Sequence, residues 1–235
     1  MNITKNKKSA VLSGKPFKYK YLSLCMLGLF TSLHANANTT VWQENFDAPA
    51  LDGKGAVNNV IDMSGVTNWS IDVSNASLTA SSDWFKVKNG LFEGRDLDGL
   101  AVWQSEAIDI SGLSGIKVSV NASESGTHEA QDFIDIEYAV DGGTFVKVAN
   151  WQSKGSESHT LVDDFTSATV EVDIPEGASL IIRVSMMNNA GSEYIRFDDV
   201  TVTSTGGGDT GGGDTGGGDT GGGDTGDTIT NACFN

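Results

Sequence analysis

Acidic side chains are the residues of this sequence with the clearest capacity for chemistry. Glu44 lies in the first segment that alternates apolar and polar residues, and Asp198 and Asp199 lie in the last such segment. Calcium is bound in proteins by about six to eight oxygens, mostly from carboxylates and carbonyls. If the first and last strands are neighbours, as is common in a jelly roll, Glu44 and Asp198 lie together. The sequence therefore predicts a structural calcium site at this pair.

Two other acidic pairs are weaker candidates for the same ion. Glu129 and Asp132 stand just before an apolar alternating segment, and we include both among the tentative calcium ligands. Asp96 and Asp98, in "RDLDG", resemble a fragment of a calcium loop that lacks the remaining ligand positions. The alternative, that all these carboxylates are simply solvated, stays open.

Tryptophans are the second candidate, because sugars stack on exposed aromatic faces. Trp42 alternates with Phe46 and is expected in the core, and Trp103 is expected to pack as well. Trp69 and Trp84 lie in stretches rich in Ser and Asn, so we expect these two rings to be exposed and name them as ligand-binding residues.

The sequence carries no recognisable catalytic constellation. Beyond residue 37, His128 and His159 are the histidines, and both lie in polar, loop-like contexts that predict solvated side chains. Neither belongs to a Gly-x-Ser-x-Gly motif. With Cys233 as the single cysteine of that part, His and Cys are too few for a structural zinc site.

The elements that must position these residues are strands. Apolar residues recur with period two, which is typical of strands with two different faces. The segments are 40–46, 115–123, 132–140, 144–151, 168–174, 179–187 and 193–204. The turn residues Asp141-Gly142-Gly143 join two of them as a hairpin. No window sustains a helical period over three turns, so residues 38–204 are predicted to form an all-β, antiparallel, jelly-roll-like sandwich.

The two ends of the chain have a different composition. Residues 1–37 have a basic leader, an apolar stretch at 21–33 and a small-x-small cleavage site, typical of a signal peptide. The apolar stretch is too short to cross about 30 Å of hydrocarbon, so we expect a secreted protein without a membrane anchor. After cleavage, nine basic residues stand against 31 acidic ones, a net charge of −22. Such a surface repels nucleic acid, so the sandwich is not expected to bind it directly.

Residues 205–228 contain four Gly-Gly-Gly-Asp-Thr repeats. Glycine triplets bury too little surface to offset their chain entropy, so this tail is predicted to be a disordered linker. Residues 229–235 are then expected to begin a further domain, which makes the chain the first part of a longer protein.

Two stretches resemble known families. "YIRFDDVTVTS" is similar to the closing strand of β-sandwich modules on secreted bacterial enzymes, including carbohydrate-binding-like modules. "TITNACFN" resembles the opening of the catalytic domain of secreted endonuclease I-type nucleases. That resemblance implies a metal-assisted phosphodiester cleavage further on, and no catalytic residue carries over to this chain.

The expected function is that of an exported, non-catalytic accessory module. Its partners would be an extracellular glycan or surface polymer and a downstream enzyme in cis, a nuclease by the resemblance. The alternatives are a carbohydrate-binding module in its own right and a sandwich that itself degrades a polysaccharide.

Overall fold

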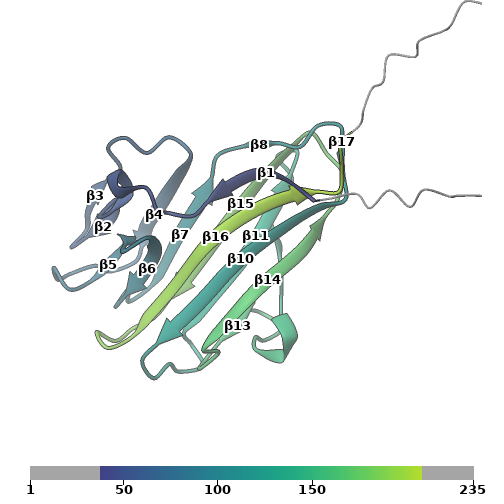
Figure 1. Ribbon diagram of the computed structural model, residues 1–235. Helices are drawn as coiled ribbons and strands as arrows, with labels where there is room; N and C mark the ends of the chain where they lie inside the picture. Colours follow the sequence, from purple (N-terminus) through teal and green to yellow (C-terminus); the bar gives the residue numbers. More distant parts are fainter. Residues whose placement is uncertain (1–37, 208–235) are drawn as a thin grey trace, which may run out of the picture. The chain divides into compact units, whose positions relative to one another are not determined.

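Antiparallel strand pairing organises residues 38–207, the part of the chain that the computed structural model describes (Figure 1). Two sheets pack face to face, which confirms the predicted all-β sandwich. The signal peptide expected at 1–37, most of the predicted linker and the start of a further domain at 229–235 lie outside the described residues. No helix within 38–207 is long and apolar enough to cross a membrane.

Sheet A forms one layer of the sandwich. In spatial order it contains β14 (Ser167–Ile174), β10 (Ile116–Ser125), β16 (Tyr194–Ser204), β6 (Leu91–Arg95), β5 (Trp84–Lys88), β2 (Gly55–Val57) and β3 (Val60–Asp62). An eighth strand, β1 (Thr39–Glu44), pairs with the second half of β16. Strand β16 therefore has β10 along one edge and shares its other edge between β6 and β1.

Sheet B forms the second layer. In spatial order it contains β12 (Val146–Lys147), β11 (Phe133–Val140), β15 (Ser179–Met187), β7 (Leu100–Ser105) and β4 (Trp69–Asn75). Two short strands join its margins, β13 (Leu161–Val162) beside β11 and β8 (Ile108–Asp109) beside β15. The predicted hairpin at Asp141–Gly143 is present, because β11 and β12 pair on either side of it.

The two ends of the described region meet at one end of the sandwich. Thr39 pairs with Ser204, so the first and last long strands are neighbours, as the sequence predicts. Gly206 and Gly207, which the sequence places in the linker, form the short strand β17 and pair with β9 (Leu113–Ser114). Ordered structure thus extends slightly past residue 204, because these glycines find backbone partners at the sandwich end.

Aromatic rings from both sheets fill the centre of the core. Phe92 of β6 and Phe197 of β16 stack at 5.2 Å, and Trp103 of β7 meets Phe197 edge-on at 5.4 Å. Phe46, in the loop after β1, inserts between the sheets and contacts these three rings. It is 1% exposed and has a backbone φ of 53°, a conformation that non-glycine residues seldom adopt. Packing in the core therefore holds the end of β1 in an unfavoured backbone geometry.

Substituting Phe46→Ala is expected to lower the free energy of unfolding by roughly 3–5 kcal/mol, because it leaves a cavity between both sheets. Urea denaturation measures the change. The control is Val60→Ala on β3, where a side chain 67% exposed should change stability by less than about 0.5 kcal/mol. Equal effects of the two substitutions would contradict the central role assigned to Phe46.

Candidate functional site

The outer face of sheet A carries polar side chains, because the apolar residues that alternate with them along each strand point into the core. On β10, Val118 and Val120 point into the core, so Ser119 and Asn121 point outward. Cross-strand register then aligns the outward residues in rows that run across several strands. One row contains Ser123 of β10, Arg196 of β16 and Glu93 of β6, and the next contains Asn121 and Asp198.

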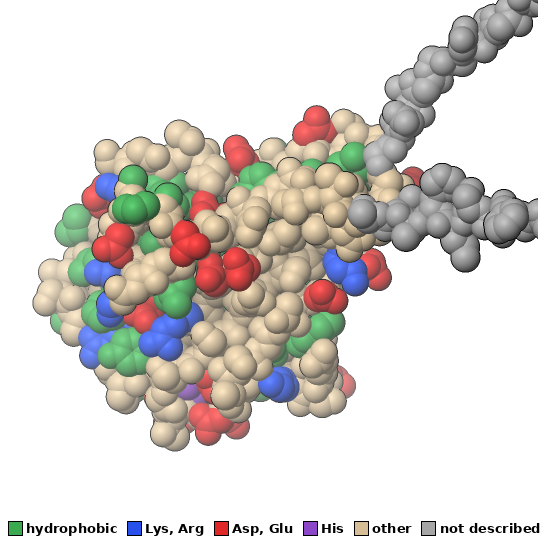
Figure 2. Space-filling model, in the orientation of Figure 1, with side chains coloured by type: hydrophobic (Ala, Val, Ile, Leu, Met, Phe, Trp, Pro, Cys, Tyr) green, Lys and Arg blue, Asp and Glu red, His purple; other side chains and the backbone are tan. Residues whose placement is uncertain are grey.

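Cations and aromatic rings gather at one end of this face. We call this cluster the Trp84 patch; it comprises Trp84, Lys86, Lys88, Glu93, Arg95, Tyr194 and Arg196. Figure 2 shows Lys and Arg side chains collected over the part of the surface formed by β5 and β6. The patch holds four of the nine lysines and arginines in residues 38–235, although the same stretch has 31 acidic residues. Positive charge is therefore concentrated locally on an acidic protein.

The Trp84 ring orders the cations around it. Lys88 Nζ lies 4.2 Å from the ring centroid, and Lys86 Nζ lies 5.0 Å from it. The guanidinium carbon of Arg95 lies 4.9 Å from the same centroid and 5.4 Å from that of Tyr194. Cations within about 6 Å of an aromatic face are attracted by its quadrupole. The predicted exposed platform at Trp84 is thus a half-buried ring lined with cations.

The buried carboxylate of Glu93 contacts three other residues of the patch. Its carboxylate accepts hydrogen bonds from Trp84 Nε1 at 3.0 Å and from Arg196 Nε at 2.6 Å, and Lys88 Nζ lies 3.3 Å away. Glu93 is 4% exposed, so these contacts are shielded from water. One buried carboxylate therefore holds an indole and two cations in fixed positions.

Arg95 links the patch to the loop that precedes β16. Its Nε donates to the Gly191 carbonyl at 2.8 Å, and its terminal nitrogens donate to the carbonyls of Gly191 and Ser82. Neutral carbonyl partners leave the positive charge of Arg95 uncompensated by these contacts. Its place in the site depends on the conformation of the loop at Gly191.

A groove of about 530 Å³ adjoins the patch over β10, β14 and β16. Hydroxyl, amide, carboxylate and guanidinium groups line it, together with the apolar residues Leu91, Ala122, Ala168 and Phe197. The polar lining residues are Asn121, Ser123, Ser167, Thr169, Arg196 and Asp198. Arg196 belongs to both the groove and the Trp84 patch, so the two form one continuous surface.

Searches of known proteins assign no family to this chain. No family model and no curated protein matches the chain. Among solved structures, TmCBM61 in complex with β-1,4-galactotriose is 14% identical, covers 57% of this chain and 86% of its own, and has a TM-score of 0.35. A structure from a study of mucin-degrading endo-acting O-glycanases of the human gut microbiota is 10% identical, with coverages of 71% and 99% and a TM-score of 0.46. A cleaved adhesin domain of Lys-gingipain from Porphyromonas gingivalis is 13% identical, with coverages of 71% and 99% and a TM-score of 0.40.

A β-bulge places two acidic residues beside Asn121. Register shifts between Ser119 and Asn121 of β10, and Asp199 has a φ of 48°. The sequence alternation puts Asp199 on the opposite face from Asp198. Instead, Asp199 accepts a hydrogen bond from Asn121 Nδ2 at 3.0 Å, while Asp198 lines the groove.

Asp198 has the most strongly shifted carboxyl group of this face. Burial raises its pKa to about 6, the backbone N–H of Asp199 opposes that shift, and the charges of Asp199, Asp47 and Glu44 raise the pKa further. The predicted neighbours Glu44 and Asp198 are thus close enough to interact electrostatically. A bound cation would relieve this repulsion, which keeps calcium as a prediction for the pair.

Glu44 already has other partners. Its oxygens accept hydrogen bonds from the Phe46 backbone at 2.8 Å, from Asn68 Nδ2 at 2.5 Å and from Trp69 Nε1 at 3.1 Å. Three of its roughly four lone-pair sites are occupied by N–H donors. A cation at Asp198 would therefore find only one further acceptor site on Glu44.

Trp69 and His128 contradict the sequence expectations. Trp69 is 4% exposed, in the core against Phe46, so it presents no ring to a ligand. His128, expected to be solvated, is 3% exposed. Asp132 is buried, whereas Glu129 is exposed and only its backbone N–H reaches Asp132, at 2.9 Å. Trp69 is buried because β4 turns it into the core, and His128 and Asp132 are buried because their loop packs against other parts of the fold, neither of which local composition reveals.

Several residues of the Trp84 patch were missed in the sequence. The alternation of Trp84, Lys86 and Lys88 does place all three on one face, and Tyr194 and Arg196 alternate in the same way. No pattern within either segment indicates that β5 and β16 lie on the two sides of the same strand, β6. That information resides in the pairing of both strands with β6.

Asp198→Asn is expected to stabilise the fold at neutral pH. The folded-state pKa lies above the ordinary value of 3.8, so the penalty for the ionised group is full above pH 6 and fades as the pH falls toward 4. In urea unfolding with a chelator present, we expect a gain of about 1–3 kcal/mol at pH 7.5 and a much smaller gain at pH 4.5. Asp173→Asn on β14, whose side chain is 90% exposed, is the control. A gain that does not depend on pH would contradict the assignment.

Calcium itself is tested on the same variant. If Glu44 and Asp198 hold the ion, 10 mM calcium should raise the melting temperature of the unmodified chain by about 3–8 °C, as expected for an extracellular site of submillimolar to millimolar affinity. The rise should vanish in Asp198→Asn and persist in Asp173→Asn. An unmodified chain that melts at the same temperature with and without calcium would remove the site.

Proposed function

We propose that this chain is an exported binding module for acidic polysaccharides, with its ligand on the outer face of sheet A. The observation that carries the proposal is the Trp84 patch, where four cations are held around two aromatic rings beside a groove of mixed polar and apolar lining. The module acts by binding, and any reaction belongs to a domain further along the chain.

The arrangement of the cations favours carboxylate or sulfate groups as ligands. Arginine presents its N–H groups in a planar fork that matches such anions. The patch contains two arginines, Arg95 and Arg196, and both are half-buried. Contacts with Trp84, Tyr194 and Glu93 restrict these side chains before a ligand arrives. Ordered side chains lose less entropy on binding, so the same contacts give a higher affinity.

The groove favours a polymer of sugars as the carrier of those anions. Sugar hydroxyls both donate and accept hydrogen bonds, and the groove offers acceptors at Asp198, donors at Asn121 and hydroxyls at Ser123 and Thr169. It is open and continuous with the patch, which suits a chain that lies across several strands.

The net charge of −22 does not prevent binding of an anion at physiological salt. Charges separated by more than about 8 Å are largely screened at 0.15 M ionic strength, so a ligand at the patch interacts mainly with the four nearby cations. At about 0.01 M the screening length is near 30 Å, and the repulsion by the whole molecule is felt. Affinity should therefore be higher at 0.1 M salt than at 0.01 M.

The second half of the proposal rests on the sequence alone. The Gly-Gly-Gly-Asp-Thr repeats and the nuclease-like segment "TITNACFN" support a tether to a downstream enzyme. A flexible tether of this length keeps a linked domain at an effective concentration on the order of millimolar. The module would thereby hold the enzyme near an extracellular polymer such as a biofilm matrix.

The test is a binding assay on the full chain with polygalacturonate, a sulfated galactan, neutral laminarin and single-stranded DNA at 0.1 M salt. We expect binding to an acidic polysaccharide and a loss of at least tenfold in the Lys86→Gln/Arg196→Gln variant. The matched control removes one lysine and one arginine of sheet B, Lys147→Gln/Arg183→Gln. Melting curves of both variants confirm that they are folded.

Three outcomes would contradict the proposal. The first is binding to DNA or laminarin in preference to both acidic polysaccharides, and the second is equal loss in the two double variants. The third is release of reducing ends from a polysaccharide by the full chain, which would instead support a catalytic sandwich.

A further inference from the structure

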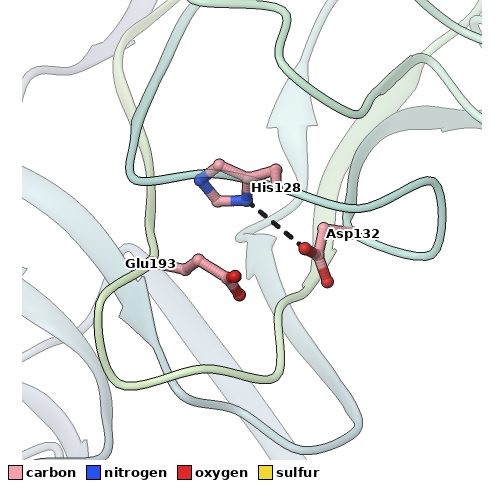
Figure 3. A group of neighbouring side chains, drawn as sticks. All are labelled: His128, Asp132 and Glu193. Carbon is pink, nitrogen blue, oxygen red and sulfur yellow. Dashed lines mark ion pairs between the residues drawn. The ribbon is translucent and has the colours of Figure 1, made fainter.

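A second group of polar side chains lies buried where the β10–β11 and β15–β16 connections meet (Figure 3). We call it the His128 cluster; it comprises Glu124, His128, Asp132 and Glu193. Glu124 lies near the end of β10, His128 and Asp132 lie in the loop to β11, and Glu193 directly precedes β16.

The imidazole of His128 lacks protein hydrogen-bond partners among residues 38–207. Its side chain is 1% exposed, and neither Nδ1 nor Nε2 makes a hydrogen bond. Asp132 Oδ2 lies 3.6 Å from Nδ1, and Glu124 Oε2 lies 3.7 Å from Nε2. Both distances exceed the range of a hydrogen bond. Because buried polar groups are nearly always paired, an imidazole with two unpartnered nitrogens requires an explanation.

The separation of 3.6 Å between His128 Nδ1 and Asp132 Oδ2 is close to that of two atoms bound to one metal ion. Atoms bound tetrahedrally at about 2.0–2.1 Å from an ion are roughly 3.4 Å apart. Ligand atoms of His128, Asp132 and Glu193 all lie within 4.8 Å of one another, and Figure 3 shows the three side chains directed toward a common space. We propose that His128 Nδ1, Asp132 and Glu193 bind a divalent transition-metal ion of the zinc type.

The remaining contacts orient these ligands. The second ring nitrogen of a metal-bound histidine usually donates to a carboxylate, and Nε2 faces Glu124 Oε2, which has no other partner within the described range. Asp132 Oδ2 accepts from the Glu129 backbone while Oδ1 stays free.

Backbone groups hold the other carboxylates of the cluster. The backbone N–H of Ala190 donates to Glu193 Oε2 at 3.0 Å, and the backbone N–H of Thr166 donates to Glu124 Oε1 at 2.6 Å. The ligands are therefore held in place by the fold itself.

The donor set selects the kind of ion. Calcium and magnesium prefer oxygen ligands, whereas an imidazole nitrogen combined with carboxylates suits zinc and its neighbours in the first transition row. The count of His and Cys in the sequence argues against zinc only because it omits carboxylates such as Asp132 and Glu193. Burial raises the pKa of both of these carboxyl groups, and a cation between them would counteract that effect.

Such an ion would join two loops that each run between the two sheets. His128 and Asp132 belong to the β10–β11 connection, and Glu193 belongs to the β15–β16 connection. Tyr194 of the Trp84 patch follows Glu193 directly, and Arg95 bonds the carbonyl of Gly191 in the same loop. The ion would therefore fix the loop that supports one margin of the outer face.

The test uses the full chain, stripped with EDTA and titrated with zinc alone. We expect one zinc per chain by calorimetry, a rise in melting temperature that tracks occupancy, and visible absorption on cobalt substitution. His128→Gln and Glu193→Gln should each abolish the binding, and Glu124→Gln should weaken it by roughly 10–100-fold. Glu193→Gln also removes a buried carboxylate, so this variant should melt no lower than the metal-free unmodified chain.

Controls separate this site from other zinc ligands of the chain. His159→Gln changes the histidine that contacts Asp135 at 3.0 Å, and Cys233→Ser removes the thiol near the end of the sequence. Both variants should bind zinc with unchanged stoichiometry. Zinc binding that survives His128→Gln and Glu193→Gln, or calcium displacing zinc at equal concentration, would overturn the proposal, as would a chain that binds no zinc at all.

Discussion

The alternation of β16 between the core and the outer face is the constraint on which the rest of the structure depends. Phe197 must pack against Phe46 and Trp103, so its neighbours Arg196 and Asp198 must face outward. A slip of one residue in register would exchange the two sets and bury the cations. The aromatic core therefore fixes which side chains lie on the other side of the sheet.

Local order of the cations, rather than their number, distinguishes the Trp84 patch from the rest of the surface. The chain is strongly acidic, and an isolated lysine on such a protein has little electrostatic effect at distances beyond the Debye length of the solution. Around Trp84, cation–π contacts and the buried carboxylate of Glu93 hold several positive groups at defined positions. A half-buried tryptophan acts here as a support for charged groups, a role that differs from that of a bare stacking platform.

The loop between β15 and β16 connects two features that are otherwise separate. Gly191 accepts from Arg95 of the Trp84 patch, and Glu193, two residues later, belongs to the buried His128 cluster. Tyr194 then begins β16 and packs beside Arg95 and Arg196. Because these contacts follow one another within four residues, a change in the conformation of this loop reaches the outer face directly.

Sequence periodicity determined the fold class, because strand alternation is a local property: segments such as 115–123 and 132–140 show which residues face the core without reference to partners. The alternation of Trp84, Lys86 and Lys88 is a signal of the same kind, but 84–88 is not among the predicted strands. Burial of loop residues was decided only by tertiary structure. His128 lies in a polar stretch like many solvated histidines, yet Glu193, 65 positions away, packs beside it. Contacts between residues so distant in sequence depend on strand order, and strand order arises from how whole sheets pair and pack.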